Sequence, residues 1–171
     1  DQIFLQESGL LKDIKDYSKN NGNIFGICGG LQMLGKVLED PYYKESSEYE
    51  HEGSVDGIGL LQLKTRFLKN KKTKQIKSES VWPSFSKIEG FEIHNGETEL
   101  DEISKTSKIK PMFKKDGLGW YLHNKKGATI SGTYIHGIFE NDLWRNSYIN
   151  QIRKNKNLPK LDKKSKSYKI K

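Results

Sequence analysis

The chain has 171 residues and a net charge of +8 at pH 7. This length is typical of one domain that can bury a sizeable core. No segment is apolar over the length that a membrane helix needs, which argues against a membrane partner. A single cysteine excludes an internal disulfide and fits a reducing compartment, so we expect a cytoplasmic protein.

The positive charge is concentrated at the C-terminal end of the chain. Residues 151–171 hold nine basic residues and one acidic residue, so they account for all of the net charge, and residues 1–150 are neutral. We therefore expect a folded domain over residues 1–153, followed by a solvated, disordered basic tail over residues 154–171. Because the chain begins at Asp1 rather than Met, we expect it to be part of a longer polypeptide.

The residue pattern in the first third of the chain predicts a helix, a strand and a second helix, in this order. Apolar residues near helical spacing predict an amphipathic helix over residues 3–19, and the run NNG at 20–22 ends it. A short apolar run over residues 24–27 predicts a buried strand. A second helical pattern follows at once, up to Leu38, and Asp40-Pro41 ends it.

The remaining two thirds predict mainly strands. We expect a polar loop at 42–57, then a glycine turn and strand at 57–67, a lysine-rich hairpin turn at 69–77 and its return strand at 75–81. A strand at 91–98 and a polar loop at 99–110 come next. Strands at 119–122 and 128–134, joined by a turn at 124–127, precede a helix at 143–152. This order favours an α/β domain whose sheet is partly covered by helices.

Cys28 is the candidate nucleophile. It stands between the predicted strand and helix, with Gly26 two residues before it and Gly30 two residues after it. A nucleophile on a sharp strand-to-helix turn adopts a strained backbone and needs small neighbours. The helix N-terminus favours a thiolate, and the N–H of Gly29 could stabilise an oxyanion. A buried structural cysteine in a glycine-rich turn is the alternative interpretation.

His136 is the candidate base. It follows an apolar strand and precedes a glycine, and a rigid strand end is a common position for a catalytic side chain. An imidazole there could deprotonate Cys28 and later protonate a leaving amine. The alternative is a histidine that only caps the strand end through hydrogen bonds.

The other histidines predict lesser roles. Glu92 and His94 alternate on one strand and so share a face, where they either contact substrate or form a hydrogen-bonded structural pair. His51 and His123 lie in polar segments and are expected to be solvated. The spacing of histidines and acids predicts no metal site.

Four stretches of the chain, in this order, resemble the glutamine amidotransferase domain of the cobyric acid synthase family. They are residues 26–35 (GICGGLQMLG) with Asp40-Pro41, residues 57–61 (GIGLL), residues 90–98 (GFEIHNGET) and residues 132–141 (GTYIHGIFEN). Each stretch is modest alone. Together they are specific to this type of class I amidotransferase, over about residues 1–153.

The resemblance implies a flavodoxin-like α/β fold and glutamine hydrolysis through a thioester. Cys28 would attack the side-chain amide of glutamine, His136 would act as base, Gln32 would hold the substrate, and the Gly29 N–H would form part of the oxyanion hole. Ammonia would pass to an ATP-dependent synthetase domain upstream, which amidates carboxylates of a corrinoid in cobalamin biosynthesis. ATP and Mg²⁺ are expected in that domain, and no cofactor is expected in this one.

The chain departs from the wider class I pattern in two ways. Many members carry a glutamate two residues after the histidine, whereas this chain has Ile138, which favours a Cys–His dyad with Glu140 as a candidate orienting acid. The strand and glycine loop that supply the other half of the oxyanion hole in the family do not precede Asp1 here. We therefore expect that the isolated fragment could be inactive.

Two alternatives to this function remain. An amidotransferase subunit that acts on a cell-wall lipid precursor would share the cysteine turn and differ in the acceptor. A non-catalytic binding module would instead use the basic tail on nucleic acid or an acidic surface, although the neutral body and the lack of a nucleic-acid motif make nucleic acid an unlikely partner.

Overall fold

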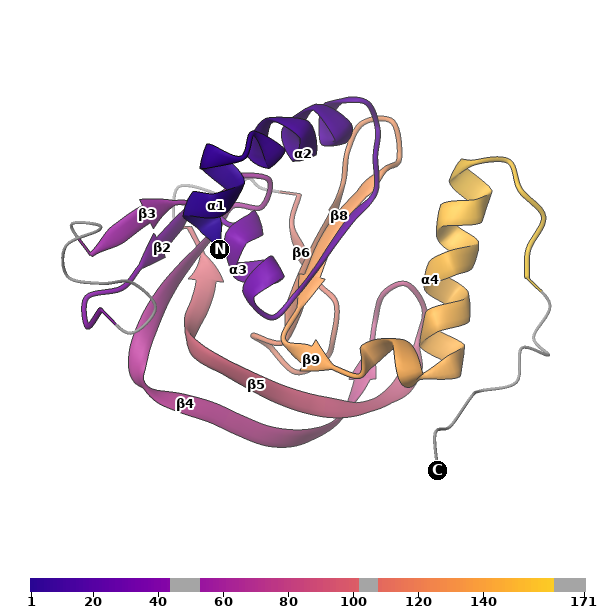
Figure 1. The fold of residues 1–171 in the computed structure, drawn as a ribbon. Helices are drawn as coiled ribbons and strands as arrows, with labels where there is room; N and C mark the ends of the chain where they lie inside the picture. Colours follow the sequence, from indigo (N-terminus) through magenta and orange to yellow (C-terminus); the bar gives the residue numbers. More distant parts are fainter. Residues whose placement is uncertain (44–52, 102–107, 162–171) are drawn as a thin grey trace.

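The computed structural model describes residues 1–43, 53–101 and 108–161 (Figure 1). Its elements are α1 (Gln2–Glu7), α2 (Leu10–Lys19), β1 (Ile24–Ile27), α3 (Gly29–Leu34), β2 (Val37–Glu39), β3 (Ser54–Asp56), β4 (Leu63–Ser80), β5 (Ser86–Leu100), β6 (Lys110–Pro111), β7 (Gly119–His123), β8 (Thr129–Thr133), β9 (Ile135–His136), the 3₁₀ helix η2 (Ile138–Glu140) and α4 (Asp142–Asn155). This mixture confirms the predicted α/β class. None of these helices has the length and apolar character required to cross a bilayer.

The strands form two mixed sheets. One has the order β1-β8-β7-β6, with β1 parallel to β8, and the other has the order β3-β2-β4-β5-β9. The long strands β4 and β5 pair as a curved antiparallel hairpin that sweeps along one side of the molecule, while α1 and α2 lie on the opposite side (Figure 1). The short segment between β8 and β9 therefore connects the two sheets.

Two groups of buried side chains form the core. One fills the space between the far end of the β4–β5 hairpin and α4, and includes Trp82, Ile88, Phe113, Trp144 and Tyr148. The other surrounds α3 and the strands β7 and β8, and includes Leu31, Leu34, Leu63, Trp120 and Tyr134. The second group supports the turn that carries Cys28, because α3 packs its apolar face into it.

The N-terminal predictions need three corrections. The expected single helix over 3–19 is two helices, because Gly9 adopts a left-handed backbone with φ of 81°. The helix expected to reach Leu38 ends at Leu34, since Gly35 is extended, and residues 37–39 form strand β2 instead. The loop expected at 42–57 contains β3 over residues 54–56, and residues 44–52 of that prediction lie outside the described part.

The lysine-rich stretch was wrongly expected to be a hairpin turn. It lies within β4, which is one strand over residues 63–80. The pairing of β4 with β5 shifts in register between Arg66 and Lys71. The chain reverses after Ser80, not at 69–77, so the expected return strand is a continuation of β4. In the described part of the chain β2 pairs with this edge of β4 over residues 64–66 and Phe113 bridges to Ser80, and the stretch of β4 between them has no strand partner on that edge. Charged residues on such an edge hinder pairing with another chain.

The later elements agree better with the sequence. Strands β5, β7 and β8 and helix α4 confirm the strands expected at 91–98, 119–122 and 128–134 and the helix expected at 143–152. Of the loop expected at 99–110, residues 102–107 lie outside the described part. The helix passes residue 153, and the Leu161 N–H donates to Asn150 Oδ1 at 2.7 Å. The boundary between domain and tail stays a prediction, because residues 162–171 are not described.

Gly26 allows β1 and α3 to pack closely. A Cβ built on Gly26 would lie 2.5 Å from the carbonyl carbon of Gly30, whereas a Cβ on Gly30 would meet nothing within 4 Å. The contact is with backbone, which cannot turn aside as a side chain can. The packing therefore requires a residue without a side chain at position 26. At position 30 it does not.

We expect Gly26→Ala to lower the free energy of unfolding by about 1–3 kcal/mol, because its methyl group forces the strand and the helix apart. Gly30→Ala is the matched control, and its stability should stay the same or rise by up to about 1 kcal/mol, since alanine favours helix over glycine. Urea denaturation of the two variants measures the difference. Equal stabilities would contradict this account of the β1–α3 contact.

Candidate active site

Cys28 occupies a strained turn between β1 and α3. Its φ of 53° and ψ of −113° lie in a region that residues with a side chain rarely adopt. The Cys28 N–H donates to the Thr133 carbonyl at 2.8 Å, which continues the parallel pairing of β1 with β8. Gly29 is the first residue of α3, so its N–H has no acceptor within the helix. The turn thus has the conformation that a nucleophile at this position requires.

His136 lies close to Cys28, as shown by one carbonyl oxygen that contacts both side chains. Cys28 Sγ is 3.1 Å and His136 Nε2 is 3.3 Å from the Ile93 oxygen. The sulfur and the nitrogen are therefore no further apart than the sum of these two distances. The position of His136 follows from the topology, since β9 leaves β8 beside Cys28 and pairs with β5 through Phe91 and His136.

The shared oxygen also limits which groups can donate in this arrangement. A carbonyl oxygen only accepts hydrogen bonds, so the Cys28 thiol is the donor in its contact with Ile93, and His136 Nε2 is a donor in the tautomer that carries its proton there. The sequence did not indicate Ile93 as part of the site, because a backbone group carries no signal in the residue type.

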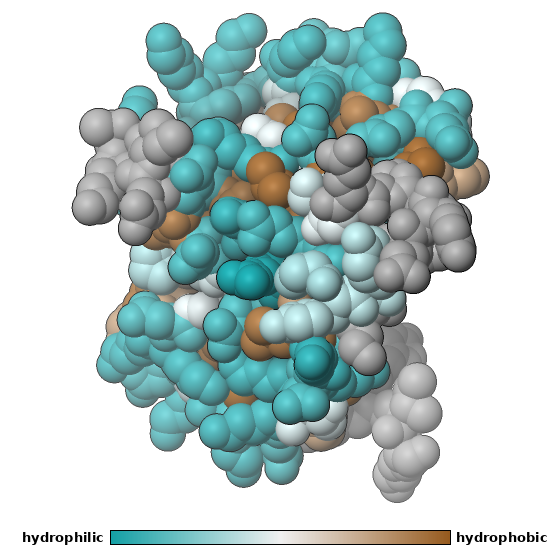
Figure 2. Space-filling view, turned by 90° about the vertical axis from the view of Figure 1, so that its left-hand side faces the viewer, coloured by the Kyte–Doolittle hydropathy of each residue, from teal (hydrophilic) through white to brown (hydrophobic). Residues whose placement is uncertain are grey.

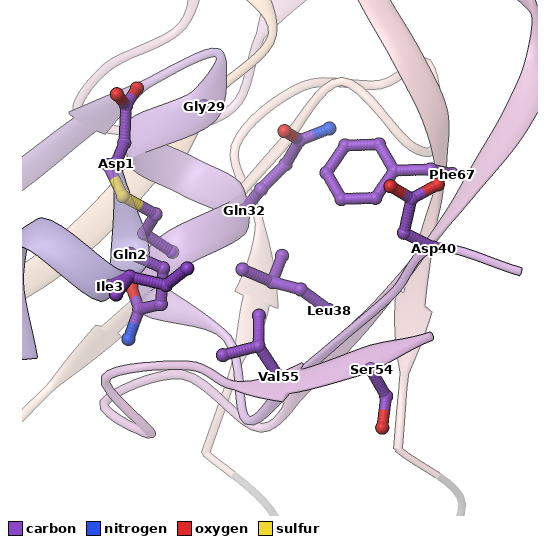
Figure 3. Close-up of a pocket in the computed structure, with 11 residues that line it drawn as sticks. Asp1, Gln2, Ile3, Gly29, Gln32, Leu38, Asp40, Ser54, Val55 and Phe67 are labelled. Carbon is purple, nitrogen blue, oxygen red and sulfur yellow. The ribbon is translucent and has the colours of Figure 1, made fainter. Parts of the chain in front are cut away.

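Gln32 and Gly29 line a cavity of about 250 Å³ beside α3 (Figure 3). Gln32 is only 6% exposed, and its amide nitrogen donates to the Asn95 carbonyl of β5 at 2.9 Å. One turn of helix separates the two residues, so they share the face of α3 that continues from Cys28. The structure thus brings together three of the predicted site residues, Cys28, Gly29 and Gln32, with His136.

Glu92 and His94 form the hydrogen-bonded pair that was one of the two expectations for them. Glu92 Oε1 accepts from His94 Nε2 at 3.1 Å and from Lys72 at 2.7 Å, and Lys115 lies 3.7 Å from Oε2. The carboxyl group is 1% exposed. Burial alone would raise the pKa of Glu92, but the Lys72 and His94 hydrogen bonds and both lysine charges outweigh it and lower that pKa.

Tyr134 links this pair to the candidate site, a role that the sequence did not reveal. It precedes β9, is fully buried, and stacks on His94 with ring centroids 3.7 Å apart. Its hydroxyl forms a short hydrogen bond with Thr98, which also bonds Thr65. Burial raises the pKa of the Tyr134 phenol, so the hydroxyl keeps its proton. The only hint in the sequence was the two-residue spacing from His136.

The Glu140 side chain is not among the partners that the structure describes for His136. It is exposed at the end of η2, where its carboxyl group faces the backbone of Gly137. Among the described hydrogen bonds and ion pairs, none joins Glu140 to His136; the bond that His136 makes goes to Ile93. The structure thus offers a carbonyl rather than a carboxylate beside the imidazole.

The other two histidines lie outside the candidate site or outside the description. His123 is at the exposed end of β7 and bonds the Thr129 hydroxyl at 2.9 Å. Burial of its ring lowers the pKa of His123. His51 is not among the described residues. Within the described ranges, no group of histidine, cysteine and acidic side chains has the arrangement of a metal site.

Comparison with known proteins places the chain in a family. The family model described as the CobB/CobQ-like glutamine amidotransferase domain matches residues 1–144, and the chain belongs to this family. It is 67% and 64% identical, over its whole length, to proteins named cobyric acid synthase from Prochlorococcus marinus strain MIT 9301 and subsp. pastoris strain CCMP1986. A third cobyric acid synthase, from strain NATL2A, is 48% identical over 92% of the chain. The chain spans about a third of the length of these relatives.

The Glu92→Gln substitution should make the free energy of unfolding less dependent on pH in the acidic range. Because folding lowers the pKa of Glu92 below its ordinary value of 4.5, the ion pairs stabilise the fold above that pH and are lost as pH falls through the lower, folded value. The variant should be less stable by about 1–3 kcal/mol at pH 7. The difference in free energy of unfolding between this variant and the unsubstituted protein should become smaller below about pH 4.5.

Urea unfolding at several pH values measures this gap. Glu89→Gln is the matched control on the same strand, because Glu89 is exposed and only loosely paired with Lys77 at 3.6 Å. Its effect should be below about 1 kcal/mol at any pH. A pH-independent gap for Glu92→Gln would contradict the assignment of the ion pairs as the cause.

Glu140→Gln should leave glutamine hydrolysis within about twofold of the unsubstituted rate, because the carboxyl group is exposed and no described hydrogen bond or ion pair joins it to the imidazole. Steady-state rates of glutamate release measure the effect. A loss of tenfold or more would instead give Glu140 an orienting role.

Proposed function

We propose that this chain is a glutaminase domain that hydrolyses glutamine through Cys28 and releases ammonia for an amidation. The single observation that supports it best is the Ile93 oxygen, which lies within hydrogen-bond distance of both Cys28 Sγ and His136 Nε2. A thiol beside an imidazole, on a strained turn at a helix start, is the arrangement of an activated cysteine nucleophile. The family membership adds the substrate, glutamine.

The reaction begins with transfer of the Cys28 proton to the imidazole of His136. This requires the thiol to leave the Ile93 oxygen and an imidazole nitrogen to accept the proton. The thiolate then attacks the amide carbon of glutamine, and the negative charge moves to the amide oxygen. In this proposal the Gly29 N–H, at the start of α3, donates a hydrogen bond to that oxygen.

The second half of the reaction releases two products. The imidazolium gives its proton to the amide nitrogen, the carbon–nitrogen bond breaks, and ammonia leaves with a glutamyl thioester remaining on Cys28. Water, deprotonated by His136, attacks the thioester carbon, and glutamate leaves as the sulfur regains its proton. Gln32, at the wall of the cavity, holds the substrate during both steps.

The acceptor is inferred from the relatives. Those with the highest identities above are named cobyric acid synthase, which supports amidation of corrinoid carboxylates in cobalamin biosynthesis. We infer that ATP and Mg²⁺ act in the part of the relatives that this chain does not span. The same names make a cell-wall lipid precursor the less favoured acceptor, and they give no support to a nucleic-acid module.

Replacing Cys28 by alanine in the full-length synthase should abolish amidation with glutamine and preserve amidation with added ammonia, because only the nitrogen supply needs the sulfur. His136→Ala should reduce glutamine hydrolysis by about 10²–10⁴-fold. His123→Ala is the matched control and should leave it unchanged, since the hydrogen bond described for His123 goes to Thr129, at the far end of β7.

Product formation is followed with both nitrogen donors. Unchanged use of glutamine by the Cys28→Ala protein would overturn the proposal. Equal losses in the two histidine variants would remove His136 from the mechanism.

A further inference from the structure

The Ile93 carbonyl lies between two buried side chains of its own strand. Glu92 and His94 flank Ile93 on β5 and share one face of the strand, because alternate residues point the same way. Their side chains are 1% and 4% exposed, and His94 Nε2 bonds Glu92 Oε1 at 3.1 Å. This hydrogen bond joins the residue before Ile93 to the residue after it, so it restricts the backbone at that point.

Two cations from other parts of the chain hold the Glu92 side chain in place. Lys72 of β4 lies 2.7 Å from Oε1, and Lys115 lies 3.7 Å from Oε2. Burial alone would favour the protonated acid, but these cations and the His94 hydrogen bond lower the pKa of Glu92. The carboxylate therefore accepts and His94 Nε2 donates.

The ring of His94 also joins β5 to the segment that carries His136. The described backbone pairing of β5 with β9 ends at Glu92 and Ile135. Directly beyond this pair, the His94 ring stacks on Tyr134, with ring centroids 3.7 Å apart and an angle of 17° between the rings. The stacking therefore extends the contact between the two segments past the end of their backbone pairing.

The His94 ring has one feature that a packing role does not explain. Among the described residues, its second nitrogen, Nδ1, is buried and has no hydrogen-bond partner. Such a nitrogen destabilises the fold, and an apolar ring of similar size would avoid this cost. The hydrogen bond to Glu92 is therefore the property that distinguishes His94 from an apolar residue at the same position.

The Ile93 oxygen is a suitable acceptor for the charged form of His136. When His136 takes the Cys28 proton, both of its ring nitrogens carry hydrogen, so Nε2 is then a donor whichever tautomer was present before. A hydrogen bond from a charged donor is stronger than one from a neutral donor. The carbonyl oxygen, 3.3 Å from Nε2, can therefore stabilise the imidazolium and favour the thiolate.

We propose that His94 is a positioning residue for glutamine hydrolysis and holds the Ile93 carbonyl toward His136. Its hydrogen bond to Glu92 fixes the strand at Ile93, and its stacking on Tyr134 fixes that strand against the segment before β9. This inference rests on the proposed glutaminase function and adds to it the residue that aligns the imidazole's acceptor. His94 acts through the backbone and exchanges no proton itself.

The test compares two substitutions of His94 in the full-length enzyme. His94→Phe keeps a ring for Tyr134 and loses the donor to Glu92, so kcat for glutamate release should fall by about 10- to 100-fold. KM should stay within about threefold, because substrate binding does not use this hydrogen bond. The acid limb of the pH profile of kcat/KM should move to higher pH, because the thiolate forms less readily when the imidazolium has lost its aligned acceptor.

His94→Gln keeps an N–H donor for Glu92 and lacks the ring. It should hydrolyse glutamine faster than His94→Phe, with the acid limb where it lies in the unsubstituted enzyme. A residue that only fills space would give the opposite order, since phenylalanine replaces the ring better than glutamine does. The opposite order would therefore overturn the proposal.

Ser86→Ala is the matched control. Ser86 lies at the other end of β5, is 8% exposed, and its hydroxyl bonds the Ser80 hydroxyl at 2.9 Å. This variant also loses a buried hydrogen bond of β5, yet its kcat and its pH profile should not change. A similar fall in kcat would show that any such loss on this strand lowers the rate, and the assignment to His94 would be wrong.

The remaining outcomes separate the two proposals. If His94→Phe keeps the full rate while Cys28→Ala has none, the role of His94 is wrong and the glutaminase function stands. A lower kcat with an unmoved acid limb shows only a loss of folded enzyme and also overturns the role of His94. If His94→Phe does not fold, His94→Gln decides the question, and a moved acid limb in that variant would contradict the proposal. If the unsubstituted enzyme releases no glutamate from glutamine, the proposed function itself fails, and the role of His94 fails with it.

Discussion

The parallel pairing of β1 with β8 is the constraint on which the rest of the site depends. It aligns Ile27 with Thr133, so the hydrogen bond from the Cys28 N–H to the Thr133 carbonyl falls at the point where both strands end. One strand continues into the strained cysteine turn and the other into the segment that carries His136. Residues more than a hundred positions apart therefore meet at one edge of a sheet, and no loop has to position either of them.

The long hairpin supplies what these two strands lack. β5 passes beside the site, presents the Ile93 carbonyl to both side chains, and receives the Gln32 amide on the Asn95 carbonyl. Behind it, Glu92 and His94 are buried, and the ring of His94 stacks on Tyr134. The face of the molecule seen in Figure 2 is largely hydrophilic, with hydrophobic side chains in small separate groups. The buried polar interactions of β5 at residues 92–95 thus belong to the part of the strand that borders the candidate nucleophile.

The sequence predicted the elements of the site better than the path of the chain around it. Gly26 and Cys28 have a spacing whose cause is local, the close approach of a strand to a helix, and local causes are visible in sequence. The lysines of β4 were misread as a turn because a solvated strand edge has the composition of a loop. Ile93 and Tyr134 were missed because their roles depend on a carbonyl and on stacking, which follow only from tertiary pairing. The roles of Cys28, Gly29, Gln32 and His136 in catalysis remain predictions.

The two-part core has a practical consequence for measuring this domain. All three tryptophans of the chain are at least nine-tenths buried, with Trp82 and Trp144 in one hydrophobic group and Trp120 in the other. Intrinsic fluorescence therefore reports on both halves of the interior at once. A single red shift on unfolding would show that the halves melt together, whereas two separate shifts would show that the region around α4 and the region around α3 are independent.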